Sequence, residues 1–110
     1  MLNQSILVGR IVQEPEVRMT ENGNKVTNLT LAVQRGFKNS NGEYDTDFIS
    51  CVLWKGIAES TVEYCKKGDL IGVRGRIQTR TVEYPDETKH NLVEVVAERV
   101  TFLSSKRADN

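Results

Sequence analysis

Aromatic side chains occur on one face of a segment with the alternation of a β-strand, residues Asp47–Trp54. Successive strand side chains point to opposite faces, so Ile49, Cys51 and Leu53 are predicted to face a core. The opposite face then carries Phe48, Ser50, Val52 and Trp54. An aromatic residue near each end of this face can stack on a flat ligand, or it can pack under a second sheet or a neighbouring subunit.

Basic residues accompany the aromatic residues on the adjacent predicted strands. Phe37 lies between Arg35 and Lys38 where the second strand ends, and Lys55 directly follows Trp54. The fourth strand carries basic residues in a single row, namely Arg74, Arg76 and Arg80. The cations therefore fall on the same elements as the rings.

Interleaved aromatic rings and cations suit a single strand of nucleic acid. Unpaired bases stack on the rings, each contributing about 1–3 kcal/mol, while Lys and Arg follow the phosphates. Alternate strand positions lie about 7 Å apart, close to the phosphate repeat of an extended strand. Because stacking does not identify the base, we predict binding with little sequence preference. The alternative is that Arg74 and Arg76 belong to a solvated strand face.

Five strands and one helix are predicted to position these side chains. The strands cover residues 5–11, 26–34, 47–54, 70–84 and 91–103, residues 35–38 prolong the second strand, and the helix covers 57–65. A helix between the third and fourth of five strands is the layout of the all-β OB-fold, a Greek-key barrel. Asn22-Gly23 predicts a hairpin, and the glycines inside the first and fourth strands, Gly9, Gly72 and Gly75, suit the bends of a closed barrel. We expect one domain, residues 1–103, and a short polar tail, residues 104–110.

The sequence shows no arrangement typical of an enzyme. His90, the single histidine, is predicted to be solvated in a loop, and Glu94 and Glu98 to face solvent on the last strand. Cys51 and Cys65 are too few for a disulfide framework or a metal cluster and are predicted to be buried thiols. No glycine-rich phosphate loop is present. We expect binding without catalysis, and neither a cofactor nor a metal.

Overall composition says little about the partner. The 110 residues contain 15 basic and 15 acidic side chains, so the net charge neither favours nor excludes a polyanion. No apolar run approaches the roughly 20 residues that span a bilayer, and the N-terminus lacks the pattern of a secretory signal. Two cysteines fit a reducing compartment. We expect a cytoplasmic protein that does not enter a membrane.

Several motifs follow one another along nearly the whole chain. They are Leu2-Asn3, Ile6–Arg10, Glu14–Arg18, Leu31–Val33, Asp47–Trp54, Tyr64–Gly68 and Gly75–Arg80. In these motifs the sequence, over about the first 103 residues, resembles the bacterial single-stranded DNA-binding proteins. The resemblance implies an OB-fold that assembles as a homotetramer around which single-stranded DNA wraps. It also implies base stacking by Phe37, Phe48 and Trp54, and phosphate contacts by basic strand residues, Arg10 among them.

Two features depart from the pattern of that family. Many members have an aromatic residue where this chain has Val82, and Tyr84, two residues later on the same strand face, is a candidate substitute. Many members also carry a flexible linker and an acidic tip that recruits replication and repair enzymes. This chain instead ends in Lys106–Asn110, either as a short paralogue or because a tail was removed. Recruitment of repair enzymes through a tail is therefore doubtful.

An OB-fold module that binds protein is the main alternative. It would use the same strand face or the edge of the first strand, and its affinity would change little with salt. A replication-restart protein that binds both DNA and a helicase is a related alternative. The pairing of aromatic residues with a row of cations favours nucleic acid, although RNA binding stays open because stacking and phosphate contacts do not read the sugar.

Overall fold

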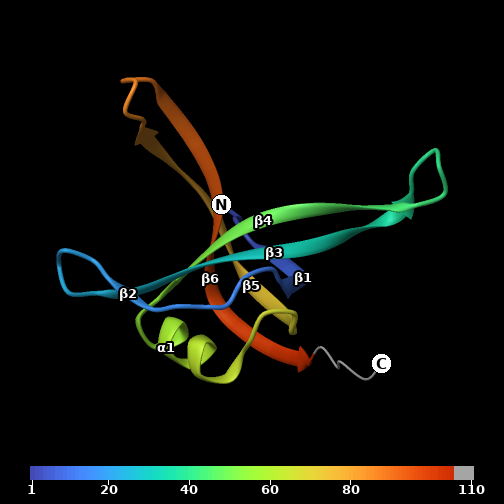
Figure 1. Cartoon of the computed structure of the whole chain (residues 1–110), viewed down its shortest axis with the longest axis horizontal. Helices are drawn as coiled ribbons and strands as arrows, with labels where there is room; N and C mark the ends of the chain where they lie inside the picture. Colours follow the sequence, from blue (N-terminus) through green and yellow to red (C-terminus); the bar gives the residue numbers. More distant parts are fainter. Residues whose placement is uncertain (106–110) are drawn as a thin grey trace.

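The computed structural model describes residues 1–105, which fold into a barrel with two projecting arms (Figure 1). The elements are β1 (Ser5–Ile11), β2 (Arg18–Met19), β3 (Lys25–Lys38), β4 (Tyr44–Trp54), α1 (Lys55–Tyr64), β5 (Leu70–Glu83) and β6 (Lys89–Ser104). The strands form one sheet in the order β1-β5-β6-β4-β3-β2, and a further pairing of β1 with β3 closes it. The predicted OB-fold barrel with one helix is confirmed. The two-residue strand β2 is an addition to the five predicted strands.

Apolar side chains from the inner rows of the long strands fill the barrel. The residues that are no more than 2% exposed include Leu29, Leu31, Cys51, Leu53, Ile71 and Val73. Complete burial of a leucine or isoleucine side chain contributes about 1.5–3 kcal/mol, so this cluster is the main source of stability. The helix α1 packs on the same core through Ala58. The prediction that Ile49, Cys51 and Leu53 face the core is confirmed, with Ile49 at its margin.

Two glycines allow the strands to approach closely enough for the barrel to close. A Cβ atom at Gly9 would lie 2.7 Å from the carbonyl oxygen of Ala32, where β1 turns from β5 to pair with β3. A Cβ atom at Gly75 would collide with the carbonyl of Val96, beside an irregularity in the β5–β6 register. Only glycine fits at such backbone contacts. Gly9 and Gly75 are two of the glycines at which the sequence predicts bends, whereas a Cβ atom at Gly72 would meet no atom closer than 3.9 Å.

Local signals in the sequence place the turns well. Gly23, with φ of 82°, and the hydrogen bond from Thr20 to Asn24 form the predicted Asn22-Gly23 hairpin between β2 and β3. The helix differs from the prediction because it begins two residues earlier, directly after β4. Lys55 makes this sharp turn with φ of 55°, a left-handed conformation that is uncommon for a residue other than glycine.

Two arms extend from the barrel in different directions (Figure 1). The β3–β4 arm comprises residues 34–46, and the β5–β6 arm comprises residues 77–93. Hydrophobic side chains on the arms are exposed, among them Phe37, Ile77 and Val93. The predicted tail began at Ser104, but β6 includes this residue. Residues 106–110 lie outside the described residues.

Candidate nucleic-acid interface

One continuous outer face of the sheet carries the predicted aromatic residues and part of the predicted cation row. Phe48 is the ladder partner of Ala32, and Trp54 is the partner of Val26. On the other side of β4, Val52 pairs with Val96, which in turn pairs with Arg76. Because directly paired residues project to the same face, Phe48, Trp54 and Arg76 share one surface. Phe48 is 66% exposed and Trp54 is 39% exposed, so both rings are accessible to a ligand.

The floor between the two rings is apolar rather than open. Val52 lies on the predicted face away from the core, yet it is 5% exposed and packs with Val26 and Val96 in a small cluster of its own. Alternation along β4 assigns a face, whereas burial depends on the neighbouring strands. This cluster is distinct from the barrel core.

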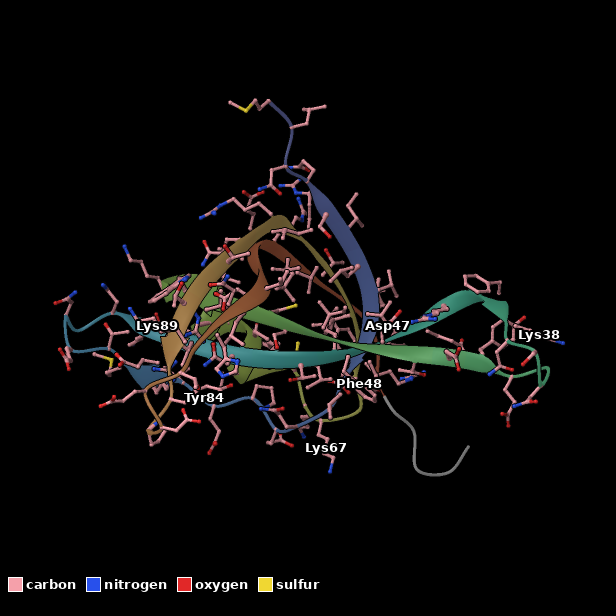
Figure 2. All side chains as sticks on the ribbon, turned by 90° about the horizontal axis from the view of Figure 1, so that it is seen from above. Lys38, Asp47, Phe48, Lys67, Tyr84 and Lys89 are labelled. Atoms are coloured by element: carbon pink, nitrogen blue, oxygen red, sulfur yellow. The ribbon has the colours of Figure 1, made fainter. Side chains whose placement is uncertain are left out.

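The β3–β4 arm carries exposed aromatic and basic side chains beyond the barrel. Figure 2 shows Lys38 near the end of this arm, with Phe48 closer to the barrel. Phe37 is 66% exposed, and the ammonium of Lys38 lies 5.9 Å from the ring centroid of Tyr44. Tyr44 is itself exposed and was not predicted as part of the site. The sequence signal that could have identified Tyr44 was its position opposite Lys38 across the Asn39–Glu43 turn.

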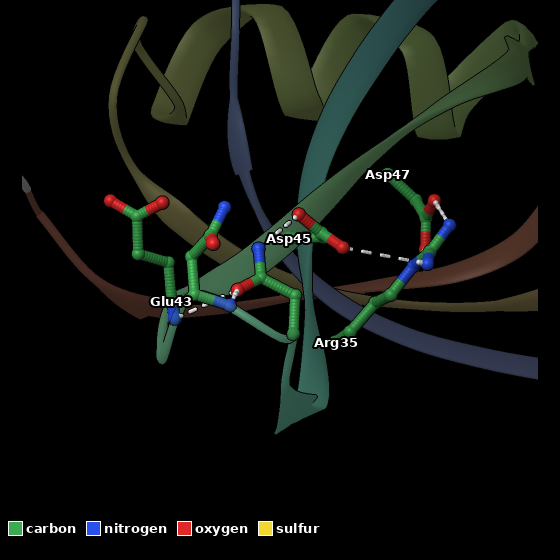
Figure 3. A network of polar contacts seen from close by, with 6 residues as sticks. Arg35, Glu43, Asp45 and Asp47 are labelled. Carbon is green, nitrogen blue, oxygen red and sulfur yellow. Dashed lines mark hydrogen bonds and ion pairs between the residues drawn. The ribbon is translucent and has the colours of Figure 1, made fainter.

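Arg35 lies on the reverse face of the β3–β4 arm. Its Nε donates to one carboxylate oxygen of Asp47 at 3.0 Å and its Nη2 to the other at 3.0 Å, while Nη1 lies 3.8 Å from Asp45 (Figure 3). Asp47 is adjacent to Phe48 on β4, so the two side chains point to opposite faces. The hydrogen bond from Arg35 lowers the pKa of Asp47. The structure therefore does not bring Arg35 together with Phe48 and Trp54.

The same network extends to the turn at the end of the arm. Asn39 donates through its side-chain amide to Asp45 at 3.1 Å, and its oxygen accepts from the backbone amides of Asn41 and Glu43 (Figure 3). This is an Asx-type turn in which the side chain replaces backbone hydrogen bonds. Polar contacts thus give the arm a defined shape where no core supports it.

The buried carboxylate of Glu94 holds the polar and basic side chains that form a row on β5. Arg76 donates to Gln78 at 3.1 Å, Gln78 donates to Glu94 at 3.1 Å, and Nε of Arg80 donates to Glu94 at 2.8 Å. The prediction that Glu94 faces solvent is wrong, since it is 7% exposed. Glu98 is exposed as predicted. Charged groups rarely become buried unless they are paired, and both partners of Glu94 come from the neighbouring strand.

The remaining predicted contacts lie at the edges of this surface. Arg74 is exposed on the outside of the barrel as the ladder partner of Ile6. Arg10 shares the outer face with Phe48 through Ala32, and it donates to the carbonyl of Gly68 at 3.0 Å. Lys55 is exposed at the start of α1, next to Trp54. All three cations remain accessible.

Tyr84 lies beyond the end of β5, near the tip of the β5–β6 arm (Figure 2). Its ring stacks on His90, with centroids 4.2 Å apart, and 43% of the residue is exposed. His90 lies in β6 rather than in the predicted loop, directly opposite Val82. The arm thus presents a stacked pair of rings next to the position where an aromatic residue was expected.

Two hollows adjoin where the barrel meets the β5–β6 arm. One contains Phe48 and Ile77, and the other contains Asn28, Thr30 and Arg80. The residues lining both hollows are Ser50, Val93 and Glu94. An extended ligand that stacked on Phe48 in the first hollow would therefore continue into the second hollow, beside Arg80.

Both cysteines have free, buried thiols. Burial raises the pKa of Cys51 to about 11, and burial followed by the charge of Asp69 raises the pKa of Cys65. Within residues 1–105, no group of three or more His, Cys, Asp or Glu side chains is arranged to hold a metal ion. The helix in this part of the chain is too short and too polar to cross a membrane.

Comparison with known proteins agrees with this geometry. Residues 2–103 match the family described as "Single-strand binding protein family". The chain belongs to this family. Single-stranded DNA-binding protein B of Bacillus subtilis is 46% identical over 96% of this chain and 94% of its own length. Single-stranded DNA-binding protein 3 of Listeria innocua is 49% identical over 97% of this chain.

The relatives of this single-strand binding family member differ in length. The chain spans 67% of the Listeria innocua protein and 63% of the single-stranded DNA-binding protein of Halalkalibacterium halodurans, with which it shares 49% identity. A solved structure described as "Plasmodium falciparum SSB complex with ssDNA" superimposes with a TM-score of 0.83 at 24% identity. It covers 94% of this chain and 96% of that one, so the two share the fold.

Proposed function

We propose that the protein binds single-stranded DNA with little sequence preference, in the cytoplasm, and protects it during replication, recombination, repair or DNA uptake. The observation that carries this proposal is the shared outer face of Phe48, Trp54 and Arg76. Exposed rings bind bases by stacking, and the accessible cations bind phosphates. The binding involves no chemical step.

The site that we propose combines rings and cations from both arms and the barrel. Phe37, Phe48, Trp54 and Tyr84 would stack on bases. The phosphate contacts would come from Arg10, Lys38, Lys55, Arg74 and Arg76. Arg35 and Arg80 were also predicted as cations of the site. They differ from the other cations because Arg35 is paired with Asp47 and Arg80 with Glu94.

The test is a titration of Trp54 fluorescence with oligo-dT, repeated over a range of salt and with duplex DNA. Stacking should quench this indole, and the affinity should fall log-linearly with salt as counterions are released from the DNA. Binding to duplex DNA should be much weaker. A protein that binds neither oligo-dT nor duplex DNA would contradict the proposal and favour an OB-fold module that binds protein.

Assembly into a homotetramer is part of the proposal. Ile6 and Val8 project outward from β1 and are 75% and 50% exposed. Apolar side chains exposed in a row favour packing against another protein surface. We expect the outer face of β1 to contact a second copy of the chain. Light scattering should give the mass of a tetramer at micromolar concentration, and the mass of a monomer would contradict this part.

A further inference from the structure

The outer face of the β5–β6 arm carries His90, the only histidine among the 110 residues. His90 is the ladder partner of Val82, and alternation along β5 places Val82 on the same face as Arg76. Arg76 in turn lies on the surface that carries the rings of Phe48 and Trp54. Because His90 is exposed, the arm extends that surface with a ring that can also carry a charge.

Unpaired positive charge is scarce on this face of the arm. Within residues 77–93, the basic side chains on the face are Arg80 and His90, because Lys89 points to the opposite face with its ladder partner Glu83. Arg80 is paired with Glu94 at 2.8 Å, so that pair carries no net charge. Among the described strands, β6 pairs here with β5 alone. A phosphate that reaches this part of the arm therefore meets an unpaired cation only when His90 is protonated.

A short chain of hydrogen bonds fixes which ring nitrogen of His90 is free. Thr88 donates its hydroxyl to Asp86 at 2.6 Å, and its backbone amide donates to the same oxygen at 3.0 Å. These bonds lower the pKa of Asp86, which is therefore an ionised acceptor. The hydroxyl has a single proton, so in its 3.0 Å contact with Nε2 of His90 the ring is the donor.

The free atom of the ring is then Nδ1. Within residues 1–105 it makes no hydrogen bond, and it is the atom that gains or loses a proton. In the neutral ring Nδ1 is an acceptor and cannot bond a phosphate oxygen, which is also an acceptor. In the protonated ring it becomes a charged donor, the kind of group that binds phosphate well. Protonation therefore switches this contact on.

Tyr84 places the ring beside the expected path of the DNA. The two ring centroids are 4.2 Å apart with an angle of 27° between the planes, and Tyr84 is 43% exposed. A strand that stacks a base on Tyr84 carries the flanking phosphates past the adjacent imidazole. The stack and the hydrogen bond to Thr88 together restrict the ring, so Nδ1 keeps a defined direction.

We propose that His90 is a phosphate contact of the bound strand that operates only in its protonated form, with Thr88 and Asp86 as its positioning residues. The inference rests on the proposed function, because the phosphate must arrive with a strand stacked on Tyr84. Histidine is the side chain whose charge ordinarily changes between about pH 5 and pH 8. The contact is therefore made at the acidic end of this range and lost at the alkaline end, so acidification strengthens DNA binding.

The experiment measures the affinity for oligo-dT at about pH 5 and pH 8 for the unmodified chain and for His90→Gln. Thymine gains no proton in this range, and other titrating groups of the protein cancel in the ratio of the two affinities. This ratio should be about two- to fivefold higher at the acidic pH, as for one exposed ion pair. The salt slope of the unmodified chain should also be steeper there by about 0.7, which corresponds to one more phosphate contact of a single strand.

His90→Arg supplies a cation at both pH values. Relative to His90→Gln, it should bind oligo-dT equally well at the acidic and the alkaline pH, and at the alkaline pH it should bind more tightly than the unmodified chain. Because His90 is exposed, both variants should fold as the unmodified chain does.

Three results would overturn the inference. A ratio of affinities that is the same at both pH values would show that the charge of His90 does not contact the strand, even if the ring stacks. A ratio that rises in acid without a change in salt slope would show that protonation acts through the shape of the arm instead of through a phosphate. If the unmodified chain bound oligo-dT at neither pH, the proposed function would fall and the inference with it.

Thr88→Val tests the positioning role. It removes the hydroxyl that accepts from Nε2 and leaves the ring able to change its charge. Nitrogen NMR should show a mixture of ring tautomers at the alkaline pH, and the rise in affinity on acidification should become smaller. Thr81→Val is the matched control, because the Thr81 hydroxyl donates to Asn91 at 2.9 Å on the opposite face of the same arm. Equal effects of the two substitutions, or an unchanged tautomer in Thr88→Val, would contradict this role.

Discussion

The barrel and the arms of this protein are stabilised in opposite ways. In the barrel, apolar side chains such as Leu31 and Leu53 are completely buried, and the backbone at Gly75 touches its neighbour directly. Where each arm joins the barrel, shape comes from polar contacts, Arg35 with Asp47 in one arm and Arg80 with Glu94 in the other. Rings that would normally be buried stay exposed there. The difference separates the residues that maintain the fold from those available to a ligand.

This separation predicts that substitutions in the barrel affect stability and substitutions on the arms and outer face affect binding. A barrel substitution that changed binding alone, or an arm substitution that changed stability alone, would show that the two regions are coupled.

Gly75→Ala should cause the largest loss of stability. The added methyl group would meet the backbone of Val96, which cannot move without opening the β5–β6 pairing. We expect a decrease of about 2–4 kcal/mol in the free energy of unfolding, measured with urea and Trp54 fluorescence. Gly36→Ala is the control, because nothing lies within 4 Å of its added Cβ and the variant should be as stable as the parent. Equal effects of the two substitutions would contradict the contrast.

Cys51 should be nearly inert toward thiol reagents in the folded protein. Burial raises its pKa from 9.0 to about 11, which lowers the thiolate fraction at pH 8 about a hundredfold. Restricted access slows the reaction further. The measurement is the rate of reaction with a chromogenic disulfide, with urea-unfolded protein as the reference. Fast labelling of Cys51 in the folded state would mean that the barrel opens readily.

Phe48→Ala should weaken DNA binding without destabilising the fold. Loss of one stacked base corresponds to about 1–3 kcal/mol, which is roughly a 5- to 150-fold loss of affinity. Because Phe48 is 66% exposed, the urea midpoint should change little. Tyr64→Ala provides the comparison, since Tyr64 is 69% exposed but ends α1, at the opposite end of the helix from Lys55. Similar losses of affinity in both variants would argue against a defined stacking surface.

Asp47→Asn should have the smallest effect, and that effect should depend on pH. The hydrogen bond from Arg35 lowers the pKa of Asp47, so its contribution is complete above the ordinary value of about 3.9. The contribution is lost as the pH falls through the lowered folded value. The variant should therefore be slightly less stable than the parent at neutral pH and equally stable in strong acid. Because the pair is exposed, the difference should also shrink with salt.

The control for this titration is Glu21→Gln, which changes an exposed carboxylate in the turn before β3. Its urea midpoint should track that of the parent at every pH. If Asp47→Asn and Glu21→Gln behaved alike, the Arg35–Asp47 pair would make no net contribution to the arm.

Local patterns were sufficient to predict most of the fold. The alternation in β1 predicted the bounds of that strand correctly, and Asn22-Gly23 marked the hairpin between β2 and β3. The glycines of the first and fourth strands included the two closing contacts, Gly9 and Gly75. Each of these features depends on a few neighbouring residues. The start of α1 was misplaced because Lys55 adopts a left-handed conformation that its residue type does not favour.

The polar partners of the arms could not be predicted, because they come from separate strands. The burial of Glu94 depends on the β5–β6 register that places Gln78 and Arg80 beside it. The pairing of Arg35 with Asp47 similarly depends on how β3 and β4 align. The sequence identifies these residues as charged, but only the assembled sheet decides which of them are neutralised.

The short parallel contact between β4 and β6 has a consequence for biosynthesis. This parallel contact has two residue pairs, Cys51 with Val95 and Val52 with Val96, and β6 is the last strand of the barrel to be made. The longest pairing of β1 is with β5. In the sheet, β5 is connected to β4 only through β6, which lies between them. The nascent chain therefore cannot close its barrel until residues near Val96 have left the ribosome. Until then the apolar rows of β3 and β4 remain exposed, and we expect this stage to be the one most dependent on chaperones.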